Sequence, residues 1–217
     1  MFGDKTMNKN FSNPMDGSCS IPADYAAVIM AAGGGTRFHS GSHKLLTHID
    51  GKPVLIHTVE RVLSAGYRTV IVVLGYQAEA LADLLQDIPV EIVLNENWER
   101  GQSTSLQRGI LHLPEGTRSA CLVLADQPFV SINTYRALAR QQEEQPDKII
   151  MPTYKGKTGN PTMFPQLTFA ELRSQSAADS GGRRLLKKYE TCLLETNDPY
   201  VIRDIDTLED FRKYTEN

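Results

Sequence analysis

A glycine-rich stretch near the amino terminus combines residue types that bind polyphosphates. It reads Ala31-Ala32-Gly33-Gly34-Gly35-Thr36-Arg37, and Lys44 follows seven residues after Arg37. Glycines let the backbone approach a ligand closely, with amide groups free to point at anions. A guanidinium matches phosphate oxygens, and an ammonium adds a point charge. The pattern predicts a cradle for a nucleoside triphosphate. A flexible glycine turn beside solvent-exposed cations is the alternative.

Two other phosphate-binding patterns do not fit this stretch. A Walker A loop requires Gly-Lys followed by Ser or Thr, which the stretch lacks. A G-x-G-x-x-G turn is interrupted because Phe38 stands at its last position. The sequence therefore disfavours an oxidoreductase that binds a dinucleotide in this cleft.

Carboxylates occur in two places that suit a metal ion. Asp126 comes directly after the apolar run 120–125, and Mg²⁺ is usually held by one or two carboxylates together with substrate phosphates. Asp204 and Asp206 point to the same side of an extended segment. We expect one of them to complete a metal site with Asp126. The alternatives are a turn before Pro128 for Asp126 and a helix N-cap for Asp206.

The segment around the single tryptophan ends where a helix is expected to begin. Gly101 permits a tight turn, and Ser103 and Ser105 place hydroxyls at a helix N-terminus, which attracts anions and polar groups. We expect a base or ribose to contact Gly101, Gln102, Ser103 and Ser105, with helix capping by Ser103 as the alternative. Trp98 is expected to be a packing residue.

Two further loops, 155–161 and 179–184, combine glycines with cations. Either loop is a candidate for binding a second, phosphate-bearing substrate. Surface loops commonly have the same composition, so neither pattern identifies a ligand by itself.

Apolar runs and helical patterns that alternate along the chain must position these residues. Short, continuous apolar runs are typical of strands buried on both faces of a parallel sheet. The expected strands are 26–31, 69–74, 90–94, 120–125 and 148–151. The expected helices run from Pro53 to Gly66, around 81–85, around 106–110 and over 133–144. This order predicts an α/β domain with an open, mostly parallel sheet, whose ligands bind beyond the carboxyl ends of the strands.

The composition excludes several classes of protein. The 217 residues include 23 basic and 26 acidic ones, a balance that offers no basic surface for nucleic acid. The three cysteines show no C-x-x-C spacing and the five histidines no H-E-x-x-H pair, so neither a disulfide framework nor a zinc site is indicated. No apolar run is long enough for a membrane span, and no secretory signal is present. We expect a disordered tail over 1–23, one domain over 24–217 and a cytoplasmic location.

Taken in order, these motifs resemble those of the nucleotidyltransferases that modify molybdopterin, and most closely the molybdenum cofactor cytidylyltransferases. The motifs are A-A-G-G-G-T-R-F, G-K-P-V-L, W-E-R-G-Q-S-T-S-L, L-A-D-Q-P, G-N-P and D-I-D-T-L-E-D. The resemblance implies a single-domain, three-layer α/β/α fold with a Rossmann-like sheet. It also implies transfer of CMP from CTP to the molybdopterin cofactor, with Mg²⁺ and release of pyrophosphate.

The resemblance assigns roles to individual residues. Arg37, Lys44 and Asp126 would be catalytic, and Asp126 and Asp206 would hold Mg²⁺. The residues that would shape the second-substrate side are Gly159, Asn160, Pro161, Asp179 and Gly182. One residue more than usual separates Asp179 from Arg183, which leaves the role of Arg183 or Arg184 open.

Other functions are compatible with the same motifs. The chain could be a guanylyltransferase for molybdopterin, or a nucleotidyltransferase that acts on a sugar or alcohol phosphate. It could also bind the cofactor and deliver it to a molybdenum hydroxylase apo-enzyme. The cradle together with two metal carboxylates favours an enzyme over such a carrier.

Overall fold

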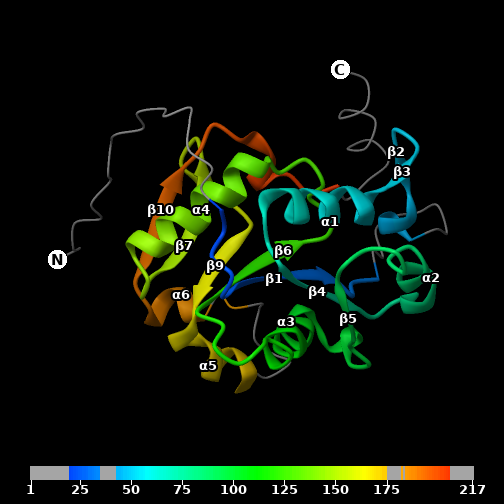
Figure 1. The fold of residues 1–217 in the computed structure, drawn as a ribbon, viewed down its shortest axis with the longest axis horizontal. Helices are drawn as coiled ribbons and strands as arrows, with labels where there is room; N and C mark the ends of the chain where they lie inside the picture. Colours follow the sequence, from blue (N-terminus) through cyan, green and yellow to red (C-terminus); the bar gives the residue numbers. More distant parts are fainter. Residues whose placement is uncertain (1–19, 35–42, 175–181, 183, 206–217) are drawn as a thin grey trace.

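The computed structural model describes residues 20–34, 43–174, 182 and 184–205, and these form one domain around a single large sheet (Figure 1). The strand order is β10-β7-β9-β6-β1-β4-β5, with β8 paired to β7. The bounds are β1 Tyr25–Ala31, β4 Thr69–Leu74, β5 Glu91–Leu94, β6 Ser119–Leu124, β7 Ile149–Tyr154, β8 Lys157–Thr158, β9 Thr162–Pro165 and β10 Thr191–Glu195. A small antiparallel pair joins β2 (His48–Ile49) to β3 (Lys52–Pro53).

The sheet is mostly parallel, as the sequence predicts. β1 pairs in parallel with both β4 and β6, β4 with β5, and β7 with β10. The exceptions are β9, which runs antiparallel between β6 and β7, and the short β8. Strand β9 is not predictable from the sequence, because its four residues end in a proline and give neither a long apolar run nor a clear alternation.

Helices cover both faces of the sheet and make three layers (Figure 1). One face carries α1 (Val54–Ala65), α2 (Ala78–Asp83) and α4 (Ile132–Glu144), and the other carries α3 (Gln102–Leu111), α5 (Phe169–Ser174) and α6 (Leu185–Lys188). Short 3₁₀ turns are η1 Lys44–Leu46, η2 Trp98–Arg100, η3 Gln166–Thr168 and η4 Pro199–Ile202. The expected α/β/α architecture is confirmed.

Strand β1 shows why its sequence is apolar at consecutive positions. Ala27 and Ile29 face the core beneath α1 and α4, whereas Ala26 and Val28 face the core beneath α3. Successive side chains of a strand point to opposite faces. A strand with helices on both sides must therefore be apolar throughout, which is the pattern that the sequence displays.

The helix ends follow the expected signals with small differences. Pro53 is the N-cap of α1, and Gly66 ends this helix in the left-handed region with φ 112°. Helix α2 ends at Asp83, so Leu84 and Leu85 follow it rather than belong to it. Ile21 is buried in the core, so packing extends into the segment that the sequence analysis assigns to the tail. Within the described ranges, the helices are too short or too polar to cross a membrane.

Gly109 lets α3 approach the central strands closely. A Cβ atom at this position would lie 2.3 Å from Val28 Cγ1 and 3.2 Å from Val73 Cγ2. We expect Gly109→Ala to lower the free energy of unfolding by about 1–3 kcal/mol in urea denaturation, since overpacking outweighs the better helix propensity of alanine. The Val28→Ala change opens space at the same point, so the double variant should lose less than the sum of the single losses. Additive losses would contradict this contact.

Candidate functional site

The carboxyl ends of three neighbouring strands bring the predicted motifs together. β1 lies between β6 and β4, so the glycine-rich turn that follows it stands between Asp126 after β6 and Tyr76 after β4. Two backbone hydrogen bonds fix this arrangement: Tyr76 N donates to Ala32 O over 3.1 Å, and Ala125 N donates to Met30 O over 3.3 Å. Ala31, Ala32, Gly33 and Gly34 thus lie at the mouth of the sheet, where ligands of open α/β sheets bind.

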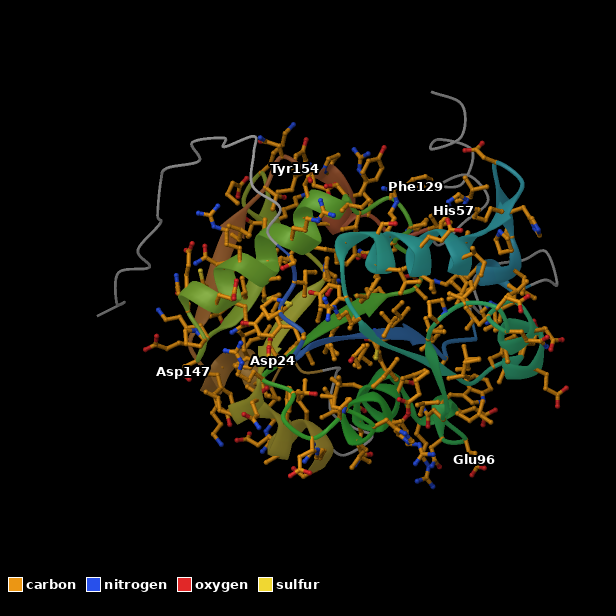
Figure 2. All side chains as sticks on the ribbon, viewed as in Figure 1. Asp24, His57, Glu96, Phe129, Asp147 and Tyr154 are labelled. Carbon is orange, nitrogen blue, oxygen red and sulfur yellow. The ribbon has the colours of Figure 1, made fainter. Side chains whose placement is uncertain are left out.

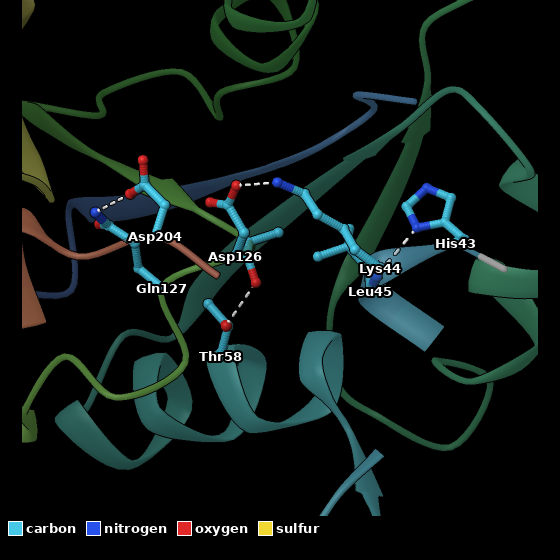
Figure 3. A network of polar contacts seen from close by, with 8 residues as sticks. His43, Lys44, Leu45, Thr58, Asp126, Gln127 and Asp204 are labelled. Carbon is cyan, nitrogen blue, oxygen red and sulfur yellow. Dashed lines mark hydrogen bonds and ion pairs between the residues drawn. The ribbon is translucent and has the colours of Figure 1, made fainter. Parts of the chain in front are cut away.

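Lys44 and Asp126 form an ion pair at this mouth. Lys44 Nζ lies 2.5 Å from Asp126 Oδ2, and the two side chains are only 13% and 20% exposed. Figure 3 shows the Lys44 side chain extending from η1 to the carboxylate. The turn that carries Asp126 is itself held by α1, because Thr58 Oγ1 donates to Ala125 O over 2.8 Å. The sequence predicts a phosphate-binding role for Lys44 and a metal-binding role for Asp126, and the structure brings the two side chains into contact.

The acidic segment near the carboxyl terminus contacts the turn that carries Asp126. Gln127 Nε2 donates to Asp204 Oδ1 over 2.6 Å (Figure 3), and Ile205 N donates to Asp126 O over 3.0 Å. Asp204 is exposed and Gln127 is buried. The Asp204 carboxylate is thus bonded to the side chain that follows Asp126, and Figure 3 shows it on the same side of the site as the Asp126 carboxylate. Among the described residues, no group of three or more histidine, cysteine or acidic side chains is arranged to hold a metal, either at this mouth or elsewhere.

Three aromatic rings line the other side of the glycine-rich turn. The His43 ring stacks on Tyr76 with centroids 5.5 Å apart, and Tyr76 meets Trp98 at 5.3 Å. A Cβ atom on Gly75 would lie 2.6 Å from Trp98 Cβ, and one on Gly34 would lie 3.2 Å from its ring. Trp98 packs over the backbone of two glycines, which confirms its predicted packing role. It also explains why glycines occupy these positions.

His43 is a site-proximal residue that the sequence analysis does not single out. It is 2% exposed, and its Nδ1 accepts a hydrogen bond from Leu45 N over 3.1 Å. Because Nδ1 is the acceptor, the proton of the neutral ring is on Nε2, which has no hydrogen-bond partner in the described part of the chain. Burial and the neighbouring Lys44 charge lower the pKa of His43 to about 4. The only sequence signal was its position next to Lys44.

The segment expected to meet a base or ribose begins at Gly101. Gly101 is the N-cap of α3 with φ 114°, a conformation that favours glycine, and it makes no side-chain capping bond. The alternative of helix capping by Ser103 is wrong, since Ser103 lies inside the first turn and is buried. Ser105 is buried as well, and its hydroxyl accepts a hydrogen bond from Asn95. Gly101 and Gln102 are the exposed members of this segment.

The loop Gly159-Asn160-Pro161 lies beside the same mouth. Thr162 pairs with Leu122 in the antiparallel register of β9 and β6, so the residues before Thr162 lie at the carboxyl end of β6. Asn160 N donates to Val201 O over 2.8 Å, and a Cβ atom on Gly159 would lie 2.0 Å from the same oxygen. This loop is therefore packed against η4, just before Asp204.

Of the remaining predicted site residues, the structure describes Gly182, whereas several others lie outside the described part of the chain. Gly182 lies on the face of the sheet that carries α3: a Cβ atom on this glycine would lie 3.2 Å from the Phe164 ring and 3.6 Å from Leu106. The residues that lie outside the described part are Gly35, Thr36, Arg37, Asp179, Arg183 and Asp206. His57 of α1, labelled in Figure 2, is not among the predicted site residues; its Nε2 donates to Ile49 O over 2.8 Å and so ties the β2–β3 hairpin to α1.

The sequence matches a family model described as a MobA-like NTP transferase domain over residues 27–192. The chain belongs to this family. It is a nucleotidyltransferase, and its mostly parallel sheet with flanking helices is the Rossmann-like fold of such enzymes. Members of a family of NTP transferases use nucleoside triphosphates as substrates, which agrees with the expected triphosphate cradle.

Other known proteins share parts of this architecture. The bifunctional protein GlmU of Bacillus thuringiensis (strain Al Hakam) is 31% identical over 118 residues, which make up 54% of this chain and 25% of GlmU. The chain thus matches about a quarter of the length of that curated relative. Rv0371C of Mycobacterium tuberculosis H37Rv, solved in complex with manganese, superposes with a TM-score of 0.74 at 26% identity, over 89% of this chain and 98% of that one.

Molybdopterin-guanine dinucleotide biosynthesis protein A of Archaeoglobus fulgidus superposes with a TM-score of 0.69 at 16% identity. The superposition covers 88% of this chain and 97% of that one. At this level of identity the likeness concerns the fold alone.

The low pKa of His43 makes stability depend on pH. The unfolded chain takes up a proton at this histidine below its ordinary pKa of 6.5, whereas the folded chain stays neutral down to about 4. The folded state therefore loses stability as pH falls from 6.5 to 4, by at most about 3 kcal/mol at 1.36 kcal/mol per unit. His43→Phe keeps a ring against Tyr76 and should show a shallower loss in urea denaturation across this window. An equal slope in both proteins would contradict the assignment.

Proposed function

We propose that the chain transfers CMP from CTP to the molybdopterin cofactor and releases pyrophosphate, with Mg²⁺ as the required metal. The observation that carries this proposal is the Lys44–Asp126 ion pair at the mouth of β1 and β6. A cation for phosphate oxygens and a carboxylate for a metal stand in contact beside a glycine-rich turn. A MobA-like chain with this pair is suited to bind a metal–triphosphate complex.

The residues present fit a magnesium ion. Asp126 supplies carboxylate oxygens at the mouth, Asp204 is bonded to the neighbouring Gln127, and Asp206 follows two residues after Asp204. Mg²⁺ accepts oxygen ligands and commonly keeps water and substrate phosphates in its shell, so one or two carboxylates suffice. Asp126 and Asp206 would hold the ion. It would supply charge neutralisation on the triphosphate when bound.

The chemistry asks little of the protein beyond positioning and electrostatics. An oxygen of the acceptor phosphate forms a bond to the α-phosphorus of CTP, and the bond from that phosphorus to the bridging oxygen breaks, so pyrophosphate leaves with the electron pair. A phosphate monoester has a second pKa near 6, so the nucleophile is already an anion at neutral pH and no strong general base is required. Lys44 and Arg37 would stabilise the charge on the triphosphate.

The acceptor would approach from the side of the 159–161 loop. This loop lies next to the carboxyl end of β6 and is bonded to η4, which leads to Asp204. Nucleotide and acceptor would then flank Asp126 from opposite sides, with Gly101 and Gln102 near the nucleoside. Asp179 and Gly182 would also contribute to the pterin side; Gly182, where an added Cβ would meet Phe164 and Leu106, would reach it from the face of the sheet that carries α3. Residues 24–217 would make up the catalytic domain.

Calorimetric titration with Mg²⁺ and each of CTP, GTP, ATP and UTP tests the nucleotide part of the proposal. CTP should bind most tightly, and Asp126→Ala should abolish the Mg²⁺-dependent part of binding. Lys52→Ala is the matched control, because Lys52 forms a comparable ion pair with Glu60 at 2.6 Å on the half-exposed surface of α1. Preference for GTP would replace cytidylyl transfer by guanylyl transfer, and the absence of any nucleotide binding would sink the proposal.

Lys44→Ala tests the role of the ion pair in turnover. Pyrophosphate release in the presence of CTP and molybdopterin should slow by at least about 100-fold, because a preorganised charge near the reacting phosphates is lost. The melting temperature should fall by only about 5 °C, since one partly exposed pair is removed. Near-normal turnover of Lys44→Ala would show that the cradle lies elsewhere.

A further inference from the structure

Asn95 is a buried amide directly after β5, in the last position before the turn to α3. It is 2% exposed, and its backbone N donates to Leu74 O over 2.8 Å, which fixes it to the end of β4. Its Oδ1 accepts from Asn97 N over 3.0 Å. Its Nδ2 donates to Thr104 Oγ1 and to Ser105 Oγ, both over 2.9 Å.

The hydrogen bonds of Asn95 have a fixed direction. A backbone N–H can only donate, so the side-chain atom that faces Asn97 N must be the oxygen, and the NH₂ group must face the two hydroxyls. Each of its two hydrogens then has one acceptor. Aspartate has the same shape but no N–H, so it cannot make the same contacts.

The Thr104 hydroxyl passes this constraint on to the turn. Because Thr104 Oγ1 accepts from Asn95, its own proton is available for backbone carbonyls. Thr104 Oγ1 lies 2.8 Å from Gly101 O and 3.0 Å from Asn97 O, and its one proton is donated toward these carbonyls. Gly101, whose carbonyl accepts this bond, has φ 114°. Its conformation sets the position of the exposed residues Gly101 and Gln102. The amide of Asn95 thus constrains the exposed Gly101–Gln102 turn through the hydroxyl of Thr104.

This turn belongs to the nucleoside half of the site rather than the phosphate half. The Lys44–Asp126 pair is anchored by η1 and by Thr58 of α1, and the described contacts of Asn95 involve neither element. Trp98, in the η2 turn that leads to Gly101, packs over Gly34 and Gly75. Its ring therefore bounds the space between the glycine-rich stretch and the Gly101–Gln102 turn. The two halves of the mouth are therefore supported by separate sets of hydrogen bonds.

From these contacts we infer that Asn95 is a positioning residue for nucleoside recognition: through Thr104 it fixes the Gly101–Gln102 turn against the base or ribose, independently of triphosphate binding. The inference rests on the proposed function, because it assumes that a nucleoside triphosphate occupies the mouth. Asn95→Asp leaves Thr104 with one proton for both the new carboxylate and Gly101 O. The turn then loses a bond, although the packing volume is unchanged.

The test compares two ligands that differ only in the nucleoside. Dissociation constants for Mg²⁺–CTP and for Mg²⁺ with inorganic tripolyphosphate are measured by calorimetry on the full chain; if the panel above prefers another nucleotide, that one replaces CTP. Asn95→Asp and Thr104→Val should each weaken nucleotide binding by about 10-fold and change tripolyphosphate binding by less than about 2-fold. Thr104→Ser keeps the hydroxyl and should bind both ligands like the wild type.

The outcomes separate the two proposals. Retained tripolyphosphate binding shows that a variant is folded, so a selective loss of nucleotide binding supports the role of Asn95. Equal weakening of both ligands, or no weakening of either, overturns that role while the wild-type preference for the nucleotide keeps the proposed function. A wild-type chain that binds the nucleotide no better than tripolyphosphate overturns both.

Discussion

The contact between Lys44 and Asp126 links the two parts of the chain on which the site depends. Asp126 is placed by the buried strand β6 and by the hydroxyl of Thr58, whereas Lys44 comes from the short turn η1 that follows the glycine-rich stretch. A close ion pair with little solvent exposure is favourable only while each charge has its partner or a substitute of the same sign. In the proposed function a triphosphate would be the substitute that Lys44 meets and a metal ion the one that Asp126 meets, so the ion pair would mark where these charges are exchanged.

The sheet makes this contact possible through its order rather than through local sequence. β1 stands between β6 and β4, so three loops that are distant in sequence end at one mouth. The antiparallel β9 then returns the chain beside β6 and delivers the 159–161 loop to the same place. Helices on both faces require strands that are apolar throughout, and Gly109 lets α3 pack closely against Val28 of β1 and Val73 of β4.

Much of this could be predicted from the sequence because it depends on neighbours in the chain. Runs such as 69–74 give strands, and Gly66 ends α1 by its left-handed conformation. The roles expected for Asp126 and Lys44 follow from their places in the chain, after the apolar run 120–125 and after the glycine-rich stretch. Asn95 and His43 were not predictable, because their roles arise from contacts with Thr104, Ser105 and Tyr76 that only the folded chain creates. Strand β9 was missed since its pairing with β6, not its four residues, makes it a strand.

The most direct test of the account is a crystal structure of the chain with Mg²⁺ and a CTP analogue that cannot be cleaved between its α- and β-phosphates. The account predicts that Lys44 Nζ leaves Asp126 and contacts a phosphate oxygen, while Asp126 turns to the metal and the nucleoside lies against Gly101 and Gln102. An analogue bound elsewhere, with the Lys44–Asp126 contact intact, would contradict it.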